Sequence, residues 1–169
     1  MNQDKSAKQK KITESSLEAA RKNVQQKPEH SMEFVLEASG ATWINNSMAT
    51  TVQLTWEALR DVNGPVLLIL GGIDRQNDYK LLQDLVRDKV KCVVFLGSQV
   101  KKYFEAFQPC TNGLICHAVD LREAVQIASA YTREGDTVLF SPCCPSYHAF
   151  DNYKNRGNEF KKLVKELVK

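Results

Sequence analysis

The sequence has no run of apolar residues long enough to cross a bilayer, which takes about 18 or more consecutive residues. Its first lysines are not followed by the apolar core of a secretory signal. We therefore predict no membrane partner, and we expect the protein to lie in the cytoplasm.

Both common phosphate-binding loops are also missing. The chain contains no G-x-x-x-x-G-K-[ST], and no G-x-G-x-x-G follows a strand-like run. With 169 residues, it is long enough for one domain of ordinary size and too short for a typical two-domain ligase or kinase. These absences exclude a self-sufficient nucleotide hydrolase.

Cysteine and histidine are too few and too irregularly spaced for a disulfide framework or a zinc site. The five cysteines are an odd number, Cys143 and Cys144 are adjacent, and no C-x-x-C occurs. We predict buried or partly exposed thiols and no metal site. His30, His117 and His148 lie in no recognisable nucleophile arrangement, so no catalytic residue is predicted.

Cationic charge exceeds anionic charge only near the N-terminus. Lys and Arg total 23 and Asp and Glu total 20, but seven of these cations and four of these anions lie in residues 1–30. The rest of the chain is neutral, which gives no broad cationic face for nucleic acid. Residues 1–11 are polar, lysine-rich and aperiodic, and we interpret them as a disordered basic leader without a site.

Beyond the leader, a weak helical pattern covers residues 12–27, and the main domain is predicted over 28–169. Met32–Ala38 and Thr42–Asn45 flank Ser39-Gly40 and are predicted to form an antiparallel hairpin. Short apolar strands then alternate with helices, which is typical of an α/β layer with a mostly parallel sheet. The four expected strands are Val66–Leu70, Cys92–Leu96, Leu114–Ala118 and Thr137–Phe140.

Three helix starts are predicted from capping residues. Asn77 precedes the stripe that begins at Leu81, Asp120 with Glu123 resembles a capping box, and Asn158 precedes the final amphipathic helix. The strands ending at Leu70, Leu96 and Phe140 are followed by Gly71-Gly72, Gly97-Ser98 and Ser141-Pro142. Loops at these carboxyl ends are where open α/β sheets bind ligands, although the same small residues also suit simple tight turns.

Three segments resemble the C-terminal domain of the Mur ligases, most closely that of the UDP-N-acetylmuramoylalanine:D-glutamate ligases. Ser141 to Ser146 and Phe150 to Phe160 are similar to the family's S-P-A-C-A-S and F-x-N-[FY]-x-x-R-G-x-x-F. The loop from Gly71 resembles the family's G-G loop, and Trp43 to Thr51 is similar to its I-N-D-S-K-A-T-N. The resemblance implies a Rossmann-like, three-layer α/β domain with a six-stranded, mostly parallel sheet, an antiparallel N-terminal hairpin and helices on both faces.

The same resemblance implies the family's chemistry. In Mur ligases, a central domain holds ATP and magnesium, a substrate carboxylate becomes an acyl phosphate, and an amino acid bound by the last domain attacks it. By position, Arg75, Ser146 and Tyr153 would border the amino acid, beside the loop residues Gly71 and Gly72. Residues 12–27 resemble the last helix of such a central domain.

Several positions depart from the family pattern where it carries charge. Asn46 replaces an aspartate, Met48 a lysine, Thr51 an asparagine and Ser31 the arginine of an H-R-x-E pattern that keeps His30 and Glu33. Hydrogen bonds to charged groups contribute about 1.5–3 kcal/mol each, so losing two or three would weaken nucleotide binding by about a thousandfold or more.

Three hypotheses follow. The first is a stand-alone domain, not catalytic alone and without a cofactor of its own, that acts as a binding or interaction module related to peptidoglycan precursor synthesis. The alternative is the C-terminal part of an ATP-dependent UDP-N-acetylmuramoylalanine:D-glutamate ligase that needs a separate ATP-binding central domain, with that domain or another cell-wall protein as partner. The third is a binder of an anionic amino acid such as D-glutamate, in a crevice at Gly72, Arg75 and Ser146.

Overall fold

The computed structural model describes residues 28–147 and 149–168. The leader predicted over 1–11, the helix predicted over 12–27 and His148 lie outside these residues.

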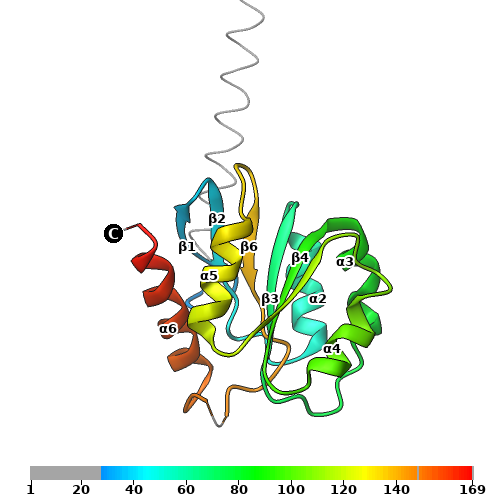
Figure 1. The fold of residues 1–169 in the computed structure, drawn as a ribbon. Helices are drawn as coiled ribbons and strands as arrows, with labels where there is room; N and C mark the ends of the chain where they lie inside the picture. The colour runs from blue at the N-terminus through cyan, green and yellow to red at the C-terminus, as the bar shows by residue number, and fades with distance from the viewer. Residues whose placement is uncertain (1–27, 148, 169) are drawn as a thin grey trace, which may run out of the picture.

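A six-stranded sheet forms the centre of the molecule, as predicted (Figure 1). Its strand order is β1-β2-β6-β3-β4-β5; β1 and β2 are antiparallel, and every other neighbouring pair is parallel. The strands are β1 Glu33–Ala38, β2 Ala41–Asn45, β3 Val66–Gly71, β4 Val90–Leu96, β5 Leu114–Ala118 and β6 Thr137–Phe140.

The β1–β2 hairpin turns through two residues that both have positive φ. Ser39 has φ +54° and Gly40 has φ +76°, and the flanking residues Ala38 and Ala41 are paired. A two-residue loop with this backbone matches the right-handed twist of the strands. The predicted hairpin is therefore confirmed, with its turn at the predicted residues.

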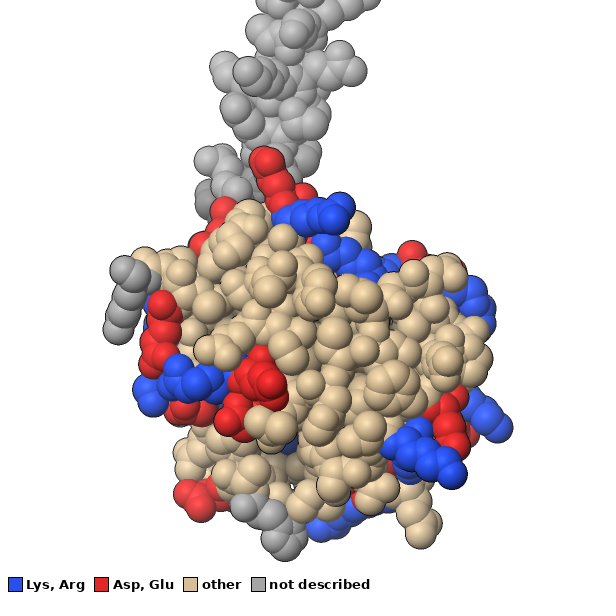
Figure 2. All heavy atoms as spheres, in the orientation of Figure 1, with Lys and Arg blue, Asp and Glu red and all other residues tan. Residues whose placement is uncertain are grey.

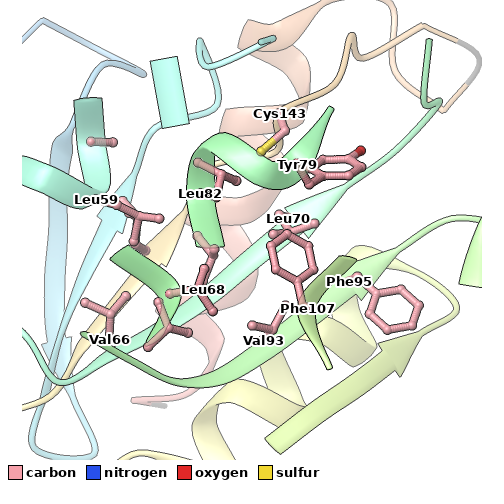
Figure 3. Close-up of a cluster of buried hydrophobic side chains, with 14 of the residues drawn as sticks. Leu59, Val66, Leu68, Leu70, Tyr79, Leu82, Val93, Phe95, Phe107 and Cys143 are labelled. Carbon is pink, nitrogen blue, oxygen red and sulfur yellow. The ribbon is translucent and has the colours of Figure 1, made fainter. Parts of the chain in front are cut away.

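Helices cover both faces of the sheet, and a hydrophobic core lies under each layer. Helices α2, η1, α3 and α4 pack on one face, and α5 and α6 pack on the other. Every residue of β3 is buried; Leu68 and Leu70 belong to the first core (Figure 3), whereas Leu67 and Ile69 belong to the second. The helices are α2 Val52–Asp61, the 3-10 helix η1 Tyr79–Leu82, α3 Gln83–Lys89, α4 Val100–Phe107, α5 Leu121–Tyr131 and α6 Tyr153–Glu166.

One of the three predicted caps is confirmed and two are wrong. The Asp120 side chain accepts a hydrogen bond from the backbone N–H of Glu123 and caps α5. Asp78 rather than Asn77 caps η1, because the Asn77 amide is used by the carbonyl of Cys143.

The third cap is misplaced because α6 begins earlier than its apolar pattern. Asn152 caps α6, and Asn158 lies exposed inside the helix. The first turns of α6 are polar and contain Gly157. Glycine disfavours helix, so the sequence pattern does not indicate a helix over these residues.

The described cysteines are free thiols, as predicted. Cys92 lies in β4 and Cys116 in β5, and of the five only Cys116 is not fully buried. In the described part of the chain, no helix is both long enough and apolar enough to span a membrane. Figure 2 shows basic and acidic side chains interspersed on the viewed face, with no continuous cationic surface.

Candidate functional site

A pocket of about 530 Å³ lies at the carboxyl ends of the parallel strands. The loops after β3, β4, β5 and β6 all contribute to it, as expected for an open α/β sheet. We call it the sheet-end pocket; the lining residues used below are Gly71, Gly72, Ser98, Asp120, Ser146, Tyr147 and Arg156.

The two glycines after β3 allow three loops to approach closely. Gly71 has φ +112°, and a Cβ there would lie 2.3 Å from the carbonyl oxygen of Leu96. Its N–H donates to the carbonyl of Pro142, and the N–H of Gly72 donates to that of Leu96. The glycines therefore join the loops after β3, β4 and β6, and both of these amides are already used within the protein.

A buried carboxylate holds the rest of the β3 loop. Asp74 is almost completely buried, lies 2.7 Å from the Nζ of Lys102 on α4, and accepts the backbone N–H of Asn77. The Asn77 amide in turn donates to the carbonyl of Cys143 in the β6 loop. These contacts fix the backbone on both sides of Arg75.

The structure brings some of the predicted amino-acid-binding residues together and separates others. Ser146 is buried and lines the sheet-end pocket with Gly71 and Gly72. Arg75 is exposed and outside the lining, with its guanidinium carbon 5.9 Å from the ring centre of Tyr147, a residue that lines the pocket. Tyr153 lies outside the lining as well, and its ring meets the imidazole of His30 edge-on.

Arg156 is a pocket residue for which the sequence suggested no role. It is only 4% exposed and donates to the carbonyl of Cys144 from Nη1 (2.8 Å), to the carbonyl of Ser47 from Nη2 (2.7 Å) and to the hydroxyl of Ser47 from Nε (3.1 Å). The sequence marks Arg156 only as the arginine of the R-G pair in the motif from Phe150 to Phe160. Such a motif cannot show that the side chain reaches a pocket.

The buried guanidinium of Arg156 forms no ion pair with a carboxylate among residues 28–147 and 149–168. Burial lowers the pKa of its guanidinium to about 10, so the group is still cationic at neutral pH. A buried cation that faces a pocket and has only neutral acceptors favours an anionic ligand.

The thiols beside this site are not nucleophiles. Burial raises the pKa of Cys143 and of Cys144 above that of an ordinary thiol. The sulfur of Cys144 lies 3.8 Å from the hydroxyls of Tyr79 and Tyr103, whose pKa values burial also raises. Reactive cysteines are thiolates, so burial in the first core disfavours nucleophilic chemistry at Cys143 and Cys144.

A second hollow of about 340 Å³ lies beside α2 and contains three of the four altered positions. We call it the α2 hollow. Thr51 is not among its lining residues, because its side chain accepts the N–H of Leu54 and caps α2. The hollow is lined by Pro28, Ser31, Met32, Asn46, Met48, Ala49, Leu54, Glu57, Ala58 and Asp61.

The α2 hollow does not fit a nucleotide phosphate. Among the described residues, its lining has two carboxylates, Glu57 and Asp61, and no lysine or arginine. The Asn46 side chain is used inside the fold, since it accepts the N–H of Met32 and donates to the hydroxyl of Ser141. Within the described residues, no group of three His, Cys, Asp or Glu side chains is arranged to hold a metal ion.

His30 and Glu33, the residues shared with the H-R-x-E pattern, join the hairpin to α6. His30 is 2% exposed, and its Nδ1 lies 3.0 Å from the amide nitrogen of Asn45. Glu33 accepts from that amide and from Lys161 on α6. His117 is exposed on β5 and packs against Phe95. Neither histidine lines the sheet-end pocket.

Known proteins resemble this chain in sequence and in fold. It is 43% identical over 140 residues to the UDP-N-acetylmuramoylalanine--D-glutamate ligase of Chlorobaculum tepidum, which covers 83% of this chain and 30% of that ligase. The enzyme of the same name from Cytophaga hutchinsonii is 42% identical, covering 82% of this chain and 31% of the relative. The chain thus spans about 30% of the length of these curated relatives. A scan against models of protein families finds no match.

Solved structures show the same fold at low sequence identity. A MurF ligase from Thermotoga maritima in complex with ADP has a TM-score of 0.51 at 14% identity, over 84% of this chain and 32% of that one. A MurF from Acinetobacter baumannii has a TM-score of 0.53 at 15% identity, over 85% of this chain and 31% of the other.

Proposed function

This chain is a homologue of the Mur ligases, and we propose that it is the amino-acid-binding domain of an ATP-dependent amide ligase that adds D-glutamate to a UDP-linked precursor. On this proposal it forms no amide alone, and the ATP-binding and precursor-binding parts are supplied by other protein segments. One observation carries the proposal: the sheet-end pocket contains a buried cation, Arg156, together with a buried serine, Ser146.

The charges around the pocket suit an amino acid with an additional carboxylate. Arg156 favours a carboxylate at the inner wall, and the Ser146 hydroxyl can donate a further hydrogen bond. Asp120 is exposed and lines the same pocket, so it can face an ammonium group. Arg75 stands at the rim beside Tyr147, where it can attract a second carboxylate.

The described residues of the α2 hollow offer no cation to a nucleotide. Its uncharged Ser31 and Met48 and its carboxylates Glu57 and Asp61 give no attraction for phosphate. The contribution of this chain to ligation is therefore to bind and orient the amino acid. This positioning can account for a large part of a rate enhancement, because it makes the reaction of two bound groups effectively intramolecular.

A reconstitution experiment tests the proposal. The Chlorobaculum tepidum ligase, truncated to remove the region that this chain matches, would be mixed with the present chain, ATP, magnesium, UDP-N-acetylmuramoyl-L-alanine and D-glutamate. We expect amide product from the mixture and none from either protein alone. A Ser146→Ala chain should raise the D-glutamate KM, whereas the control Ser129→Ala, on α5 and outside the pocket lining, should not.

Absence of product from the mixture, with both proteins folded, would contradict the ligase proposal. The altered α2 hollow favours a second candidate in that case, namely a binding module that does not take part in nucleotide chemistry. Calorimetric titration with D-glutamate and with ADP separates the ligase domain from the binding module. Heat of binding with D-glutamate supports amino-acid binding, whereas a flat trace with both compounds supports a module that binds another protein.

A further inference from the structure

Arg156 links the sheet-end pocket to the chain segment beside the α2 hollow. Its side chain contributes to the lining of the sheet-end pocket, and two of its three hydrogen bonds go to Ser47. Ser47 lies between Asn46 and Met48, which both line the α2 hollow. A single guanidinium therefore connects the lining of the sheet-end pocket to the short segment that follows β2.

The Ser47 segment is held tightly at this point. The Ser47 hydroxyl donates to the carbonyl of Tyr153 (2.7 Å), while the Ser47 backbone N–H donates to the side-chain oxygen of Asn45. Arg156 binds the hydroxyl and the carbonyl of the same residue. A change in the position of the guanidinium must therefore change the contacts of Ser47.

The three hydrogen bonds of Arg156 use one N–H on each of its three nitrogens. An arginine has five N–H donors, so a second N–H on Nη1 and on Nη2 is available to a ligand. All of the present acceptors are uncharged. A hydrogen bond to a carboxylate is roughly twice as strong as one to a neutral acceptor, so a carboxylate in the sheet-end pocket will compete with the bonds to Cys144 and Ser47.

We propose that Arg156 is the carboxylate-binding residue of the sheet-end pocket and couples its occupancy, through Ser47, to the Asn46–Met48 wall of the α2 hollow. This inference rests on the proposed function for its ligand, an anionic amino acid. Coupling of two sites is reciprocal, so a partner or ligand that contacts the α2 hollow will change the affinity of the pocket for the amino acid by the same factor.

The methionines allow a direct test in the full chain. Met32 and Met48 line the α2 hollow, and neither lines the sheet-end pocket. Protein labelled with ¹³C at the methionine methyl groups and with ¹⁵N would be titrated with D-glutamate. We expect the Gly72 amide and the Met48 methyl resonances to move with the same dissociation constant.

Three variants separate coupling from general damage. Arg156→Lys keeps the charge and loses the planar fork, so we expect about tenfold weaker binding and loss of the Met48 shift. Ser47→Ala removes the hydroxyl and should reduce the Met48 shift by at least half at saturation while the Gly72 amide still responds. Ser98→Ala changes a lining residue that makes none of the three hydrogen bonds of Arg156 and should leave the Met48 shift intact.

The outcomes are distinct. Saturation of the Gly72 amide without movement of Met48 overturns the coupling and leaves the proposed function standing. A Met48 shift of wild-type size in folded Arg156→Lys protein overturns the role of Arg156. If wild-type protein shows no response at either site, both the amino-acid function and the coupling are contradicted.

Discussion

Gly157 lies directly against the imidazole of His30, so closely that a Cβ on Gly157 would be 2.2 Å from His30 Nδ1. Helix propensity alone predicts that Gly157→Ala stabilises α6 by about 1 kcal/mol. The contact predicts the opposite sign, a loss of about 1–3 kcal/mol in the free energy of unfolding, because neither the helix nor the buried ring has room to move.

Urea unfolding checks this sign. Asn158→Ala is the matched control, since Asn158 is the next residue of α6 and is exposed. We expect the control to be neutral or slightly stabilising. Stabilisation by Gly157→Ala would mean that His30 does not pack against the helix as described.

Lys89 stabilises the end of α2 from a neighbouring segment. Its Nζ lies 2.9 Å from the carbonyl oxygens of Leu59, Arg60 and Val62, near the negative end of the helix dipole. We expect Lys89→Met to lower the free energy of unfolding by about 1–3 kcal/mol. The control Lys101→Met removes only an exposed pair with Glu105 and should change it by less than about 0.5 kcal/mol. Equal effects of the two variants would argue against the capping role.

The free energy of unfolding should decrease as the pH is lowered, because of His30. Burial, and secondly the charge of Lys161, lowers the pKa of His30, although Glu29 and Glu33 act in the opposite direction. The charge of Lys154 lowers the pKa of His30 further. The unfolded chain therefore takes up a proton at a higher pH than the folded chain does. The His30 contribution is complete above the unfolded pKa of about 6.5 and is lost as the pH falls toward the lower folded value.

The measurement compares chemical unfolding at several pH values for wild type and His30→Gln. Lys161 lowers the pKa of Glu29, so protonation of this carboxylate in acid also destabilises the fold. Subtracting the variant's curve of unfolding free energy against pH from that of the wild type removes this contribution of the carboxylates. The difference should shrink as the pH falls below 6.5. A difference that does not depend on pH would show that His30 titrates normally in the folded protein.

Restoring the missing cations should restore attraction for a nucleotide. Ser31→Arg with Met48→Lys would place two cations in the α2 hollow, and each charge-assisted hydrogen bond that forms should contribute about 1.5–3 kcal/mol, or about ten- to a hundredfold in affinity. Calorimetry with ADP measures the gain. Gln53→Lys with Gln126→Lys adds the same two charges on the exposed surface, outside the hollow, and controls for net charge. If the double variant binds ADP no better than this control, the altered positions are not what prevents nucleotide binding.

Much of the fold could be predicted because its signals are local. The apolar strands were recognisable since β3 is buried throughout, and Ser39-Gly40 marked the hairpin by its turn chemistry. The sequence pattern of apolar and capping residues did not indicate where α2 and α4 begin and end. The start of α6 was misplaced because Gly157 serves a contact with His30, a residue more than a hundred positions away in the sequence.

The candidate site was only partly predictable for the same reason. The rule that ligands bind at the carboxyl ends of the strands located Gly71 and Gly72, whereas Ser146 came from the resemblance to the Mur ligase motif. Whether a long side chain reaches the pocket depends on tertiary packing, and Arg75 and Tyr153, which are expected to border the amino acid, lie outside the lining of this pocket. Arg156 was visible only as part of a motif, since burial without a carboxylate partner is a property of the folded chain.

The backbone amides of Gly71 and Gly72 are already occupied by the carbonyls of Pro142 and Leu96. Ligand choice at the neighbouring pocket is therefore left to side chains such as Ser146 and Tyr147, neither of which holds the three loops together through the glycine contacts. Substitutions at these positions can alter which molecule is accepted while the frame stays in place. The domain thus separates the residues that select the ligand from those that hold the loops together.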